Sequence, residues 1–368
     1  MDETEQASSL KIAPASPGFH LLKKKPVARP STRRASRGAA RGGGLREVLR
    51  VSPEPYRYYT EAQVHEALTR SPGQYVAFMK RSLRVIAEGR ASLTLPPKQV
   101  FEDAATRGDF RVMPCELRAE GRVTKTVKLI GTNTVQRAVP DQITVGKLLV
   151  LDPAENFVSA VLEACLLSSA RTGACAALAV DALARARQEM VVIGSGRVGF
   201  YAALYGVAAA GVKRVVFCDV VARRARDAAR GVAARFPSAR CEARSLDSIS
   251  TADVVVLATT SETPVASPPG WGANLIVSLG ADTDSQSELD PAWARSADIY
   301  CDTLDTLRFG DLRAWIEAGI ADPAGVTDLL HVYRRSPPAS DRPRVFISTG
   351  SALFDNLTVR YLHKDRRR

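Results

Sequence analysis

Residues 191–200 read Val-Val-Ile-Gly-Ser-Gly-Arg-Val-Gly-Phe, and this stretch decides the fold. Its glycines, Gly194, Gly196 and Gly199, have the G-x-G-x-x-G spacing, directly after a short apolar run and at the start of a helical apolar pattern. A second apolar run follows and ends on an acid, Asp219. A strand, a glycine-rich turn, a helix and a second strand that ends in an acid are the context that the dinucleotide motif requires. The stretch therefore predicts a Rossmann unit that binds NAD.

Each residue of the turn has an expected role toward the cofactor. Gly194 permits the tight turn, Gly196 lets the backbone approach the pyrophosphate, and Gly199 lets helix and strand pack closely. Arg197 and Val198 open the helix, whose free N–H groups and positive dipole end face the phosphates. We therefore expect these five residues to form the pyrophosphate side of the site.

The acid at the end of the second strand predicts which cofactor is bound. A carboxylate at Asp219 accepts hydrogen bonds from the ribose hydroxyls of NAD and repels the 2′-phosphate of NADP. Arg223 and Arg224 follow closely, and their charges weaken that preference. Two alternatives stay open: the same unit without a cofactor, and a flavin in place of NAD, although we find none of the further motifs of flavin enzymes.

The rest of the C-terminal half continues the same rhythm. Apolar runs at 215–218, 254–258 and 275–279 alternate with helical patterns. Alternating strands and helices form a parallel sheet, and strands that are apolar throughout suit a sheet covered on both faces. A last helix is expected over 351–362. The predicted fold class is α/β, with a Rossmann-type doubly wound parallel sheet.

The Rossmann unit begins in the middle of the chain, so the residues before it must build a second domain. Apolar spacing predicts two helices over 60–88, interrupted at Pro72-Gly73, and then short extended runs between 92 and 152. An Ala-rich helix is expected to start around 168–172. This mixture predicts an α+β domain beside the parallel sheet.

The net charge of +12 is concentrated at the two ends of the chain. Residues 1–50 hold eleven Lys and Arg against four Asp and Glu, and 363–368 hold four against one, which leaves a net +2 for the remainder. Basic tails bind polyanions non-specifically and do not form a surface that reads nucleic acid. Pro, Ser, Arg and Gly dominate 1–52, so we expect a disordered basic arm there, with a targeting role as the alternative.

Cysteine usage and hydropathy favour a cytoplasmic protein. Six Cys are scattered without a C-x-x-C pair or the spacing of metal ligands, which is typical of reduced thiols. We see no uninterrupted apolar run of about eighteen residues. The N-terminus lacks the apolar core of a signal peptide. We therefore predict neither a membrane span nor a bound metal.

Two cations stand in otherwise apolar segments before the Rossmann unit. Lys128 lies inside the predicted strand 126–130, where a Lys is otherwise a snorkelling edge residue. Arg171 lies at the start of the Ala-rich helix, either at an exposed end or facing a ligand. Both side chains bind carboxylates through charge-assisted hydrogen bonds, so together they suggest a carboxylate pocket.

A series of short motifs runs through the chain in a fixed order. They are Val112-Met113-Pro114, Val127-Lys128-Leu129, Ala170-Arg171-Thr172, the turn 194–199, Ala258-Thr259-Thr260-Ser261, Gly280-Ala281-Asp282, Glu288-Leu289-Asp290, Phe309-Gly310-Asp311-Leu312, and Ser348-Thr349-Gly350 followed by Asp355. In this order, and with a spacing of 43 between Lys128 and Arg171, the chain resembles the ornithine cyclodeaminase/mu-crystallin family from about residue 60 to 362.

The resemblance implies a homodimer formed through the domain that precedes the Rossmann unit. That domain would then serve both substrate binding and dimerisation. We accordingly divide the chain into a disordered basic arm (1–52), the first part of the substrate-binding and dimerisation domain (53–180), the NAD-binding Rossmann domain (181–325) and a return to the substrate domain with a C-terminal helix (326–368).

The resemblance also implies roles for single residues. Lys128 and Arg171 match ligands of the substrate carboxylate, and Lys98 falls near a third family cation that is normally Arg, although a Lys lacks its bidentate fork. Asp282 matches the acid that transfers protons in the cyclodeaminases, with a loop cap as the alternative, and Lys128 is expected to assist it. The further residues expected at the dinucleotide are Arg171, Thr172, Thr259, Thr260, Leu279 and Ser348.

One position departs from the family pattern. Cyclodeaminases carry a Glu just before Met-Pro that faces the side-chain amine of the substrate, and here that position is Arg111. Glu116 is the candidate to replace it. Without such a carboxylate the substrate's side chain need not be an amine, which puts ornithine in doubt. The stretch 131–140 also differs from the usual family sequence.

These residues predict hydride transfer at the Cα of an amino acid, with Asp282 moving protons on the amine. Our first hypothesis is a cyclodeaminase, in which a side-chain amine attacks the imine, ammonia leaves and the ring imine is reduced. The alternatives are an amino-acid dehydrogenase or imine reductase, and a catalytically silent nucleotide-binding protein like mu-crystallin. The expected partners are an amino or imino acid and a second copy of the chain, with no specific nucleic acid and no membrane.

Overall fold

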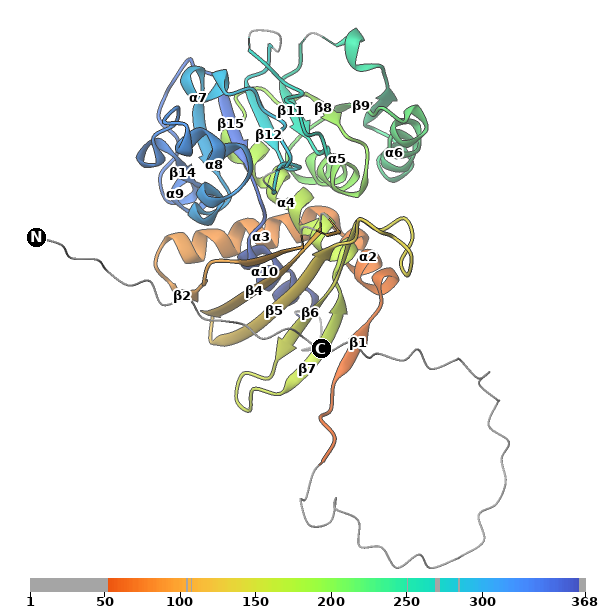
Figure 1. Ribbon diagram of the computed structural model, residues 1–368, viewed down its shortest axis with the longest axis vertical. Coiled ribbons are helices and arrows are strands. Elements are labelled where there is room, and N and C mark those ends of the chain that lie inside the picture. The colour runs from red at the N-terminus through yellow and green to blue at the C-terminus, as the bar shows by residue number, and fades with distance from the viewer. Residues whose placement is uncertain are drawn as a thin grey trace, which may run out of the picture. The chain divides into compact units, whose positions relative to one another are not determined.

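A computed structural model of the protein describes residues 52–363, apart from 104, 107, 250, 269–271 and 284. These residues form two lobes, each built around its own β-sheet (Figure 1). One sheet is parallel and the other is mostly antiparallel, which confirms the expected fold class. The basic arm expected over 1–52 lies outside the described residues except for Ser52.

The first lobe is built from seven strands and the helices α2 (Glu61–Arg70) and α3 (Pro72–Ala87). The strands are β1 (Arg57–Tyr59), β2 (Ala91–Thr94), β3 (Gln99–Asp103), β4 (Gly108–Ala119), β5 (Arg122–Thr132), β6 (Thr144–Leu151) and β7 (Val158–Glu163). Their order is β1-β7-β6-β5-β4-β2, with β3 also paired to β4. The pair β1 and β7 is parallel and the other pairs are antiparallel. Two helices followed by extended runs are what the apolar spacing predicted.

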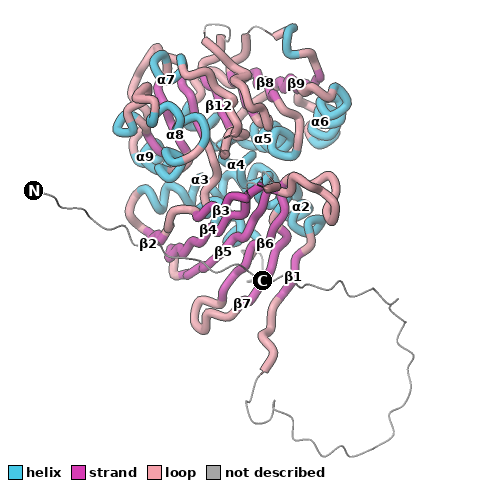
Figure 2. The backbone as a smooth tube through the Cα atoms, viewed as in Figure 1, coloured by secondary structure: helices cyan, strands magenta, loops and turns pink. Residues whose placement is uncertain are grey.

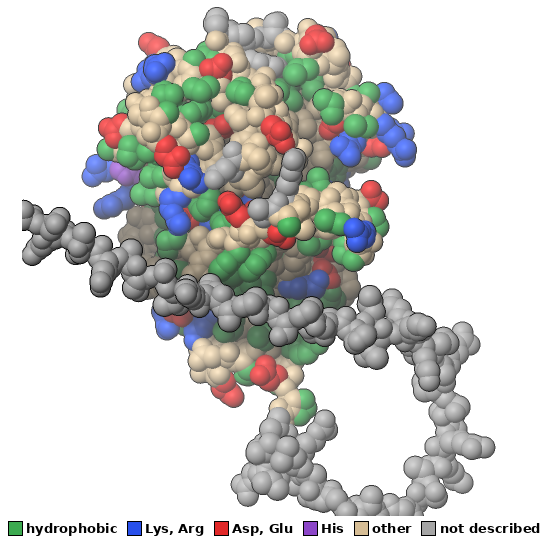
Figure 3. Space-filling model, viewed as in Figure 1, with side chains coloured by type: hydrophobic (Ala, Val, Ile, Leu, Met, Phe, Trp, Pro, Cys, Tyr) green, Lys and Arg blue, Asp and Glu red, His purple; other side chains and the backbone are tan. Residues whose placement is uncertain are grey.

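The two faces of this first sheet differ in exposure. Along β4 and β5 every second side chain is buried, and Met113 lies directly opposite Lys128 in the strand register. On the other face Phe110 and Leu129 are 54% and 43% exposed, and Phe101 stacks on Phe110. Figure 3 shows hydrophobic side chains at the surface of this lobe. The sheet thus has one face in the core and an apolar face at the surface.

The second lobe is a parallel sheet of eight strands with helices on both sides (Figure 2). The strands are β8 (Glu189–Ile193), β9 (Arg214–Cys218), β10 (Arg240–Ala243), β11 (Val254–Leu257), β12 (Leu275–Ser278), β13 (Asp298–Cys301), β14 (Thr327–Asp328) and β15 (Arg344–Ile347). The α-helices are α5 (Arg197–Ala209), α6 (Ala222–Arg235), α7 (Ala292–Ser296), α8 (Gly310–Glu317) and α9 (Leu329–Arg334). Short 3-10 helices span Leu246–Ser248, Leu304–Arg308 and Pro323–Gly325.

The strand order of the second sheet places a ligand site. The order is β10-β9-β8-β11-β12-β15-β13-β14. From β10 to β12 this is the order of doubly wound dinucleotide-binding sheets, in which the winding reverses between β8 and β11. Ligands of such sheets bind at that reversal, outside the carboxyl ends of the strands. The glycine-rich turn follows β8 and lies at this edge.

Helix α4 (Cys165–Leu183) connects the lobes and is buried along most of its length. It packs on α5 so closely that a Cβ at Gly173 would lie 2.6 Å from the backbone of Ala202. Among the described helices α4 is long and apolar enough to cross a membrane, but its burial is that of a core helix. Small side chains therefore serve here to bring two helices together.

Helix α4 begins at Cys165, earlier than the expected start at 168–172. The backbone N–H groups of Cys165 and Leu166 donate to the two carboxylate oxygens of Glu61, each at 2.8 Å. A carboxylate satisfies the free N–H groups at a helix N-terminus and interacts favourably with the dipole. Because this cap comes from α2, more than a hundred residues earlier in the sequence, it could not be predicted from the local sequence.

The chain returns to the first lobe later than expected. We placed the return at 326–368, but β14 and β15 belong to the second sheet, and β15 pairs with both β12 and β13. The helix α10 (Ala352–Leu362) then packs on β4, β5, α3 and α4. The four residues of β15 follow a Pro-rich passage, which suggested that the sheet had already ended. The boundary expected at 325 thus falls inside the second sheet, and the C-terminal helix lies at Ala352–Leu362.

Candidate active site

The glycine-rich turn joins β8 to α5 in the geometry that its motif requires. Gly194 has a φ of +90°, and a Cβ there would lie 2.3 Å from the carbonyl oxygen of Ala258. A Cβ at Gly199 would lie 2.1 Å from the carbonyl oxygen of Gly194. A Cβ at Gly196, by contrast, would meet open space. The turn is thus packed on its inner side and open at the N-terminus of α5, where a phosphate fits.

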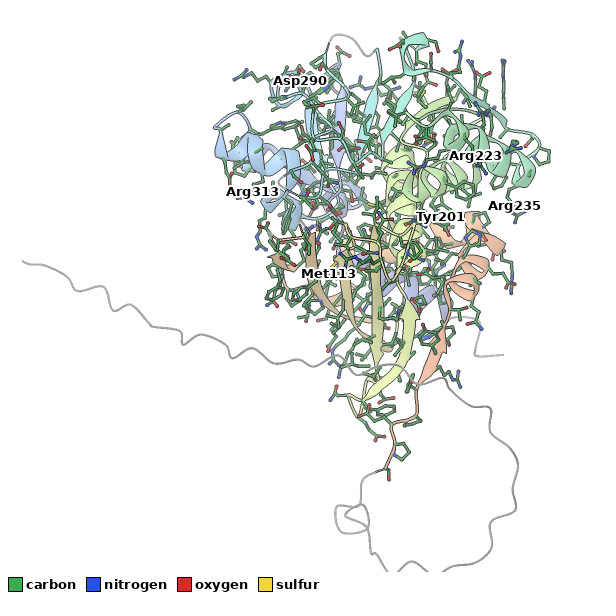
Figure 4. All side chains as sticks on the ribbon, turned by 45° about the vertical axis from the view of Figure 1, so that its right-hand side comes forward. Met113, Tyr201, Arg223, Arg235, Asp290 and Arg313 are labelled. Carbon is green, nitrogen blue, oxygen red and sulfur yellow. The ribbon has the colours of Figure 1, made fainter. Side chains whose placement is uncertain are left out.

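Asp219 follows β9 directly and lies beside this turn. Its Oδ2 accepts a hydrogen bond from the backbone N–H of Ser195 at 2.8 Å, and its Oδ1 accepts one from Val221 at 2.8 Å. Arg223, on the solvent side of α6 in Figure 4, pairs with Asp227 at 3.5 Å. The carboxylate is therefore fixed next to the turn, where the ribose of an adenosine is read in such folds.

The other expected cofactor contacts lie mainly at the carboxyl ends of neighbouring strands. Thr259 and Thr260 follow β11, Leu279 follows β12, and Ser348 follows β15. Ser348 Oγ donates to Asp302 at 2.7 Å. The remaining four lie on helices, Arg171 and Thr172 on α4 and Arg197 and Val198 on α5. Thr172 is buried and donates to the carbonyl of Ser168, and Arg197 donates to the carbonyl of Asp141. The structure thus gathers the strand-end residues at one edge of the second sheet.

A buried glutamate, Glu288, ties two of these strand ends together. Its Oε1 accepts hydrogen bonds from Thr259 N (2.6 Å) and Oγ1 (2.9 Å). Its Oε2 accepts from Ser278 Oγ (2.7 Å), Leu279 N (3.1 Å) and Gly280 N (2.8 Å). Burial raises the pKa of Glu288, and these hydrogen bonds oppose the shift. Sequence reasoning assigned Glu288 no role, although it opens one of the motifs.

Lys128 and Arg171 meet at a buried carboxylate of α10. Lys128 Nζ lies 2.8 Å from Asp355 Oδ2, and Arg171 Nε lies 3.1 Å from Asp355 Oδ1. Lys128 Nζ also donates to Ser168 Oγ at 3.1 Å. Because Lys128 is fully buried on the core face of β5, the interpretation as a snorkelling edge residue is wrong. We call Lys128, Arg171 and Asp355 the cationic end of the site.

The cationic end keeps donors available for a further anion. Burial lowers the pKa of Lys128 to about 7, with Arg171 adding to the shift and Asp355 opposing it. The guanidinium of Arg171 lies against Gly350, where a Cβ would come within 2.7 Å of Nη1. Among the described residues neither Nη1 nor Nη2 has a hydrogen-bond partner. Two cations thus share one carboxylate.

Lys98 lies in the loop between β2 and β3, close to the same region. Its Nζ donates to the carbonyl oxygen of Thr349 at 2.8 Å and lies 3.7 Å from the centre of the Phe309 ring. Burial lowers the pKa of Lys98 to about 8, and the charge of Asp282 is the largest opposing effect. The third predicted cation is thus brought to the site, with a neutral carbonyl and an aromatic ring as its nearest partners.

Arg111 stands between two carboxylates. Its Nη1 donates to Asp282 Oδ2 at 2.5 Å, and its Nη2 donates to Asp109 Oδ2 at 2.6 Å. Burial raises the pKa of Asp282, and the charge and hydrogen bonds of Arg111 lower it; the pKa lies below its usual value. The charges of Lys98 and Arg171 act in the same direction as Arg111. We call Asp109, Arg111 and Asp282 the acidic end.

Glu116 does not reach this site. Arg111 and Met113 lie on the buried face of β4, whereas Glu116 lies on the alternate face and pairs with Arg118 at 2.7 Å. The suggestion that Glu116 replaces the missing carboxylate is therefore wrong. Asp109 and Asp355 complete the two ends, and sequence reasoning gave neither a role. Asp355 belongs to the motif that begins at Ser348, which could have pointed to a role in the site, whereas no motif includes Asp109.

Most of the chain matches a known family. Residues 59–366 match the ornithine cyclodeaminase/mu-crystallin family. The chain belongs to this family. The resemblance carried by the motifs is thereby confirmed over nearly its entire length.

The proteins and solved structures to which this chain is similar carry different enzyme names. Alanine dehydrogenase of Archaeoglobus fulgidus is 26% identical over 303 residues, which are 78% of this chain and 88% of that protein. L-lysine cyclodeaminase of Streptomyces rapamycinicus is 28% identical over 274 residues, 72% of this chain and 78% of that protein. The structure of Thermococcus litoralis Δ1-pyrroline-2-carboxylate reductase with NADH and L-proline has a TM-score of 0.75 at 18% identity, covering 84% of this chain and 96% of that one. The similar proteins thus include a dehydrogenase, a reductase and a cyclodeaminase.

Proposed function

We propose that this protein is an NAD-dependent enzyme that oxidises the Cα–N bond of an α-amino acid to an imine, or reduces such an imine in reverse. The observation that carries the proposal is the opposite charge of the two ends of the site. The cationic end consists of two cations paired with one carboxylate, and the acidic end consists of two carboxylates paired with one cation. A zwitterionic amino acid has the complementary pattern, with a carboxylate beside an ammonium.

The dinucleotide end of the site supports NAD as the cofactor. The open N-terminus of α5 at Gly196 suits a pyrophosphate, and the fixed carboxylate of Asp219 suits the ribose hydroxyls. Thr259, Thr260, Leu279 and Ser348 line the strand ends beside them. When bound, the nicotinamide ring supplies the hydride acceptor.

The residues of the two ends divide the work on the substrate. Lys128 and Arg171 hold the α-carboxylate, with Lys98 beside them, and this fixes the orientation of Cα. Asp282 is ionised at neutral pH because of Arg111, so it binds the ammonium and accepts a proton from it. The hydrogen on Cα leaves with its electron pair, and the C=N bond forms as the amine loses its proton. Water then replaces nitrogen, which gives a 2-oxo acid, ammonia and NADH.

Within this reaction class the geometry favours dehydrogenation or imine reduction over cyclodeamination, our first hypothesis. Cyclodeamination needs a substrate with a second amine, and a free carboxylate is the usual partner of that amine. Asp109 is paired with Arg111, Asp282 is the proposed partner of the α-ammonium, and Glu116 faces away. Cyclodeamination is the second candidate, and the presence of Asp282, the residue that matches the proton-transferring acid of cyclodeaminases, supports it.

A single assay separates these reactions. The full chain is incubated with NAD⁺ and a panel of amino acids, and NADH absorbance and ammonia are followed together. We expect both to appear in equal amounts for at least one amino acid, and NADP⁺ in a parallel series to be the poorer cofactor. Ammonia without NADH would favour cyclodeamination. Neither product, together with no oxidation of NADH by 2-oxo acids plus ammonium or by cyclic imino acids, would contradict an enzyme of this class.

We also propose that the protein assembles as a homodimer through the exposed face of its first sheet. Phe110 and Leu129 lie at the surface of that face, beside the exposed Phe101. Contiguous apolar side chains at a surface are typical of interfaces. Light scattering of the wild type and of Leu129→Glu tests the proposal: the wild type should have twice the mass of the variant, and a monomeric wild type at micromolar concentration contradicts it.

A further inference from the structure

Asp355 is a fully buried carboxylate whose partners come from two other elements of the fold. It lies on α10, Lys128 on β5 and Arg171 on α4. Each of its oxygens takes one cation, at 2.8 Å for Lys128 and 3.1 Å for Arg171. A buried charge is costly unless it is paired, and this one is paired twice.

Without Asp355 the two cations would face each other in a buried region. Like charges at close range repel strongly where water is excluded. Among the described residues, three charged groups act most strongly on Lys128. Asp355 from α10 favours its charged form, whereas Arg171 from α4 and Arg111 from β4 oppose it. Removing that carboxylate lowers the pKa of Lys128 below its present value of about 7. A larger fraction of Lys128 would then be neutral at neutral pH, and Lys128 would bind an anion more weakly.

The position of Asp355 also decides where Arg171 points. Asp355 engages Nε, which leaves the two Nη atoms of Arg171 to a ligand. The guanidinium has room because Gly350 has no Cβ. The carbonyl of the preceding residue, Thr349, accepts the hydrogen bond of Lys98. The short segment 349–355 therefore contacts all three cations of the site.

We propose that Asp355 is the positioning residue of the anion site: it orients Lys128 and Arg171 toward the carboxylate of one ligand and favours the charged form of Lys128. Asp355 itself does not touch the ligand, because both of its oxygens face the two cations. The inference rests on the proposed function only in taking a carboxylate as the ligand. In this proposal the C-terminal helix α10 contributes the carboxylate that orients the two cations, which lie on β5 and α4.

The test measures anion binding without turnover. Glyoxylate, pyruvate and 2-oxobutyrate are titrated by calorimetry into the full chain with NADH, in buffer free of ammonium, from pH 6 to 9. We expect Asp355→Asn to weaken binding by on the order of tenfold or more at pH 7. The pH at which binding fails should also move lower, since Lys128 loses its proton more readily. The dissociation constant of NADH should change little, whereas the melting temperature should fall, because two buried cations lose the carboxylate that they share.

Two further variants complete the design. Asp253→Asn is the control, because Asp253 accepts hydrogen bonds from the backbone of Gln188 and Glu189 at the far edge of the second sheet; it should leave anion binding unchanged. If Asp355→Asn does not fold, Asp355→Glu carries the test. Glu keeps the charge but displaces it by one methylene, so binding should weaken several-fold while its pH limit stays in place.

The outcomes are distinct. Unchanged anion binding in Asp355→Asn, or in Asp355→Glu when that variant carries the test, overturns the proposal. A loss of NADH binding and anion binding together also overturns it, since that is a structural role. Failure of the wild type to bind any of the three 2-oxo acids overturns it as well. The proposed reaction can fail separately, when the amino-acid panel yields no NADH although the 2-oxo acids bind and depend on Asp355.

Discussion

The two ends of the site use the same three-group arrangement with the charges reversed. At the cationic end a carboxylate, Asp355, lies between two cations; at the acidic end a cation, Arg111, lies between two carboxylates. Burial also differs: the side chain of Lys128 is 0% exposed, whereas that of Asp282 is 34% exposed. In each case the central group offsets part of the outer charge and leaves one charge for a ligand.

The difference shows how the ends can work in different ways. Lys128 is held on both sides, by Asp355 and by Ser168, so it suits a fixed anion contact. Asp282 is held by Arg111 on one side and is otherwise accessible, so it suits a group that exchanges protons. The buried end therefore binds and the accessible end reacts. The predictions below test this division, beginning with the reacting end.

The largest effect is expected at Asp282. Asp282→Asn keeps the shape but removes the proton acceptor, so kcat should fall by about 10²- to 10⁴-fold. NAD binding should stay nearly unchanged, because the dinucleotide turn lies on other strands. Steady-state kinetics on the amino acid found in the panel, with a separate titration of NAD⁺, measure both. Asp290→Asn, at the outer side of the second lobe in Figure 4, is the matched control. If Asp282→Asn kept the kcat of the wild type, Asp282 would not be the group that exchanges protons, and the two ends could not be divided into one that binds and one that reacts.

Substitutions of Lys128 and Arg171, the cations of the binding end, should raise KM. Lys128→Met and Arg171→Met each remove a charge-assisted hydrogen bond to the carboxylate. Such a bond contributes about 1.5–3 kcal/mol, so we expect KM to rise by about 10- to 150-fold in each variant. Initial rates over a wide substrate range separate this from an effect on kcat. Lys125→Met is the control, because Lys125 lies on the same strand but contacts Pro153 and Asn156. If kcat fell while KM held, Lys128 would belong to the reacting end.

The charge of Arg111, at the centre of the acidic end, should affect how kcat/KM depends on pH. Arg111 holds the pKa of Asp282 below its usual value, so Arg111→Met raises that pKa. Oxidation needs Asp282 ionised, and ionisation is lost as pH falls through the pKa. The acidic limb of kcat/KM should therefore move to higher pH in Arg111→Met, by less in Arg111→Lys, which keeps the charge. Profiles from pH 5 to 9 measure the shift. An unmoved acidic limb would separate Arg111 from the proton transfer.

The parts of the site that sequence could predict are those whose signals are local or chemically unusual. The turn 194–199 and Asp219 are close in sequence, and their spacing carries the geometry. Lys128 and Arg171 stood out because cations are rare in apolar elements. Their meeting point could not be predicted, because Asp355 reaches Arg171 across a separation of 184 residues through the packing of α10.

The same limit explains what the sequence misplaced. Glu61 caps α4 from 104 residues away, so the helix starts earlier than its own residues suggest. The four residues of β15 are too few to identify a strand after a Pro-rich passage, yet they complete the second sheet. Glu116 followed the motif closely enough to be suggested as a substrate contact, but the alternation of a strand turns it to the other face. Contacts between distant segments, and the face of a strand, had to come from the structure.

The smallest effect is expected at Glu116, and it decides whether the acidic end includes a third carboxylate. Glu116 lies on β4, the strand of Arg111, but on the alternate face, and its partner is Arg118. Surface ion pairs of this kind contribute little, about 0–1 kcal/mol. Glu116→Gln should therefore change KM and kcat by less than about twofold for every amino acid in the panel, diamino acids included. Rates with ornithine, lysine and alanine side by side measure it. If KM rose for the diamino acids alone, Glu116 would be holding a side-chain amine, and cyclodeamination would replace dehydrogenation as the better account of the site.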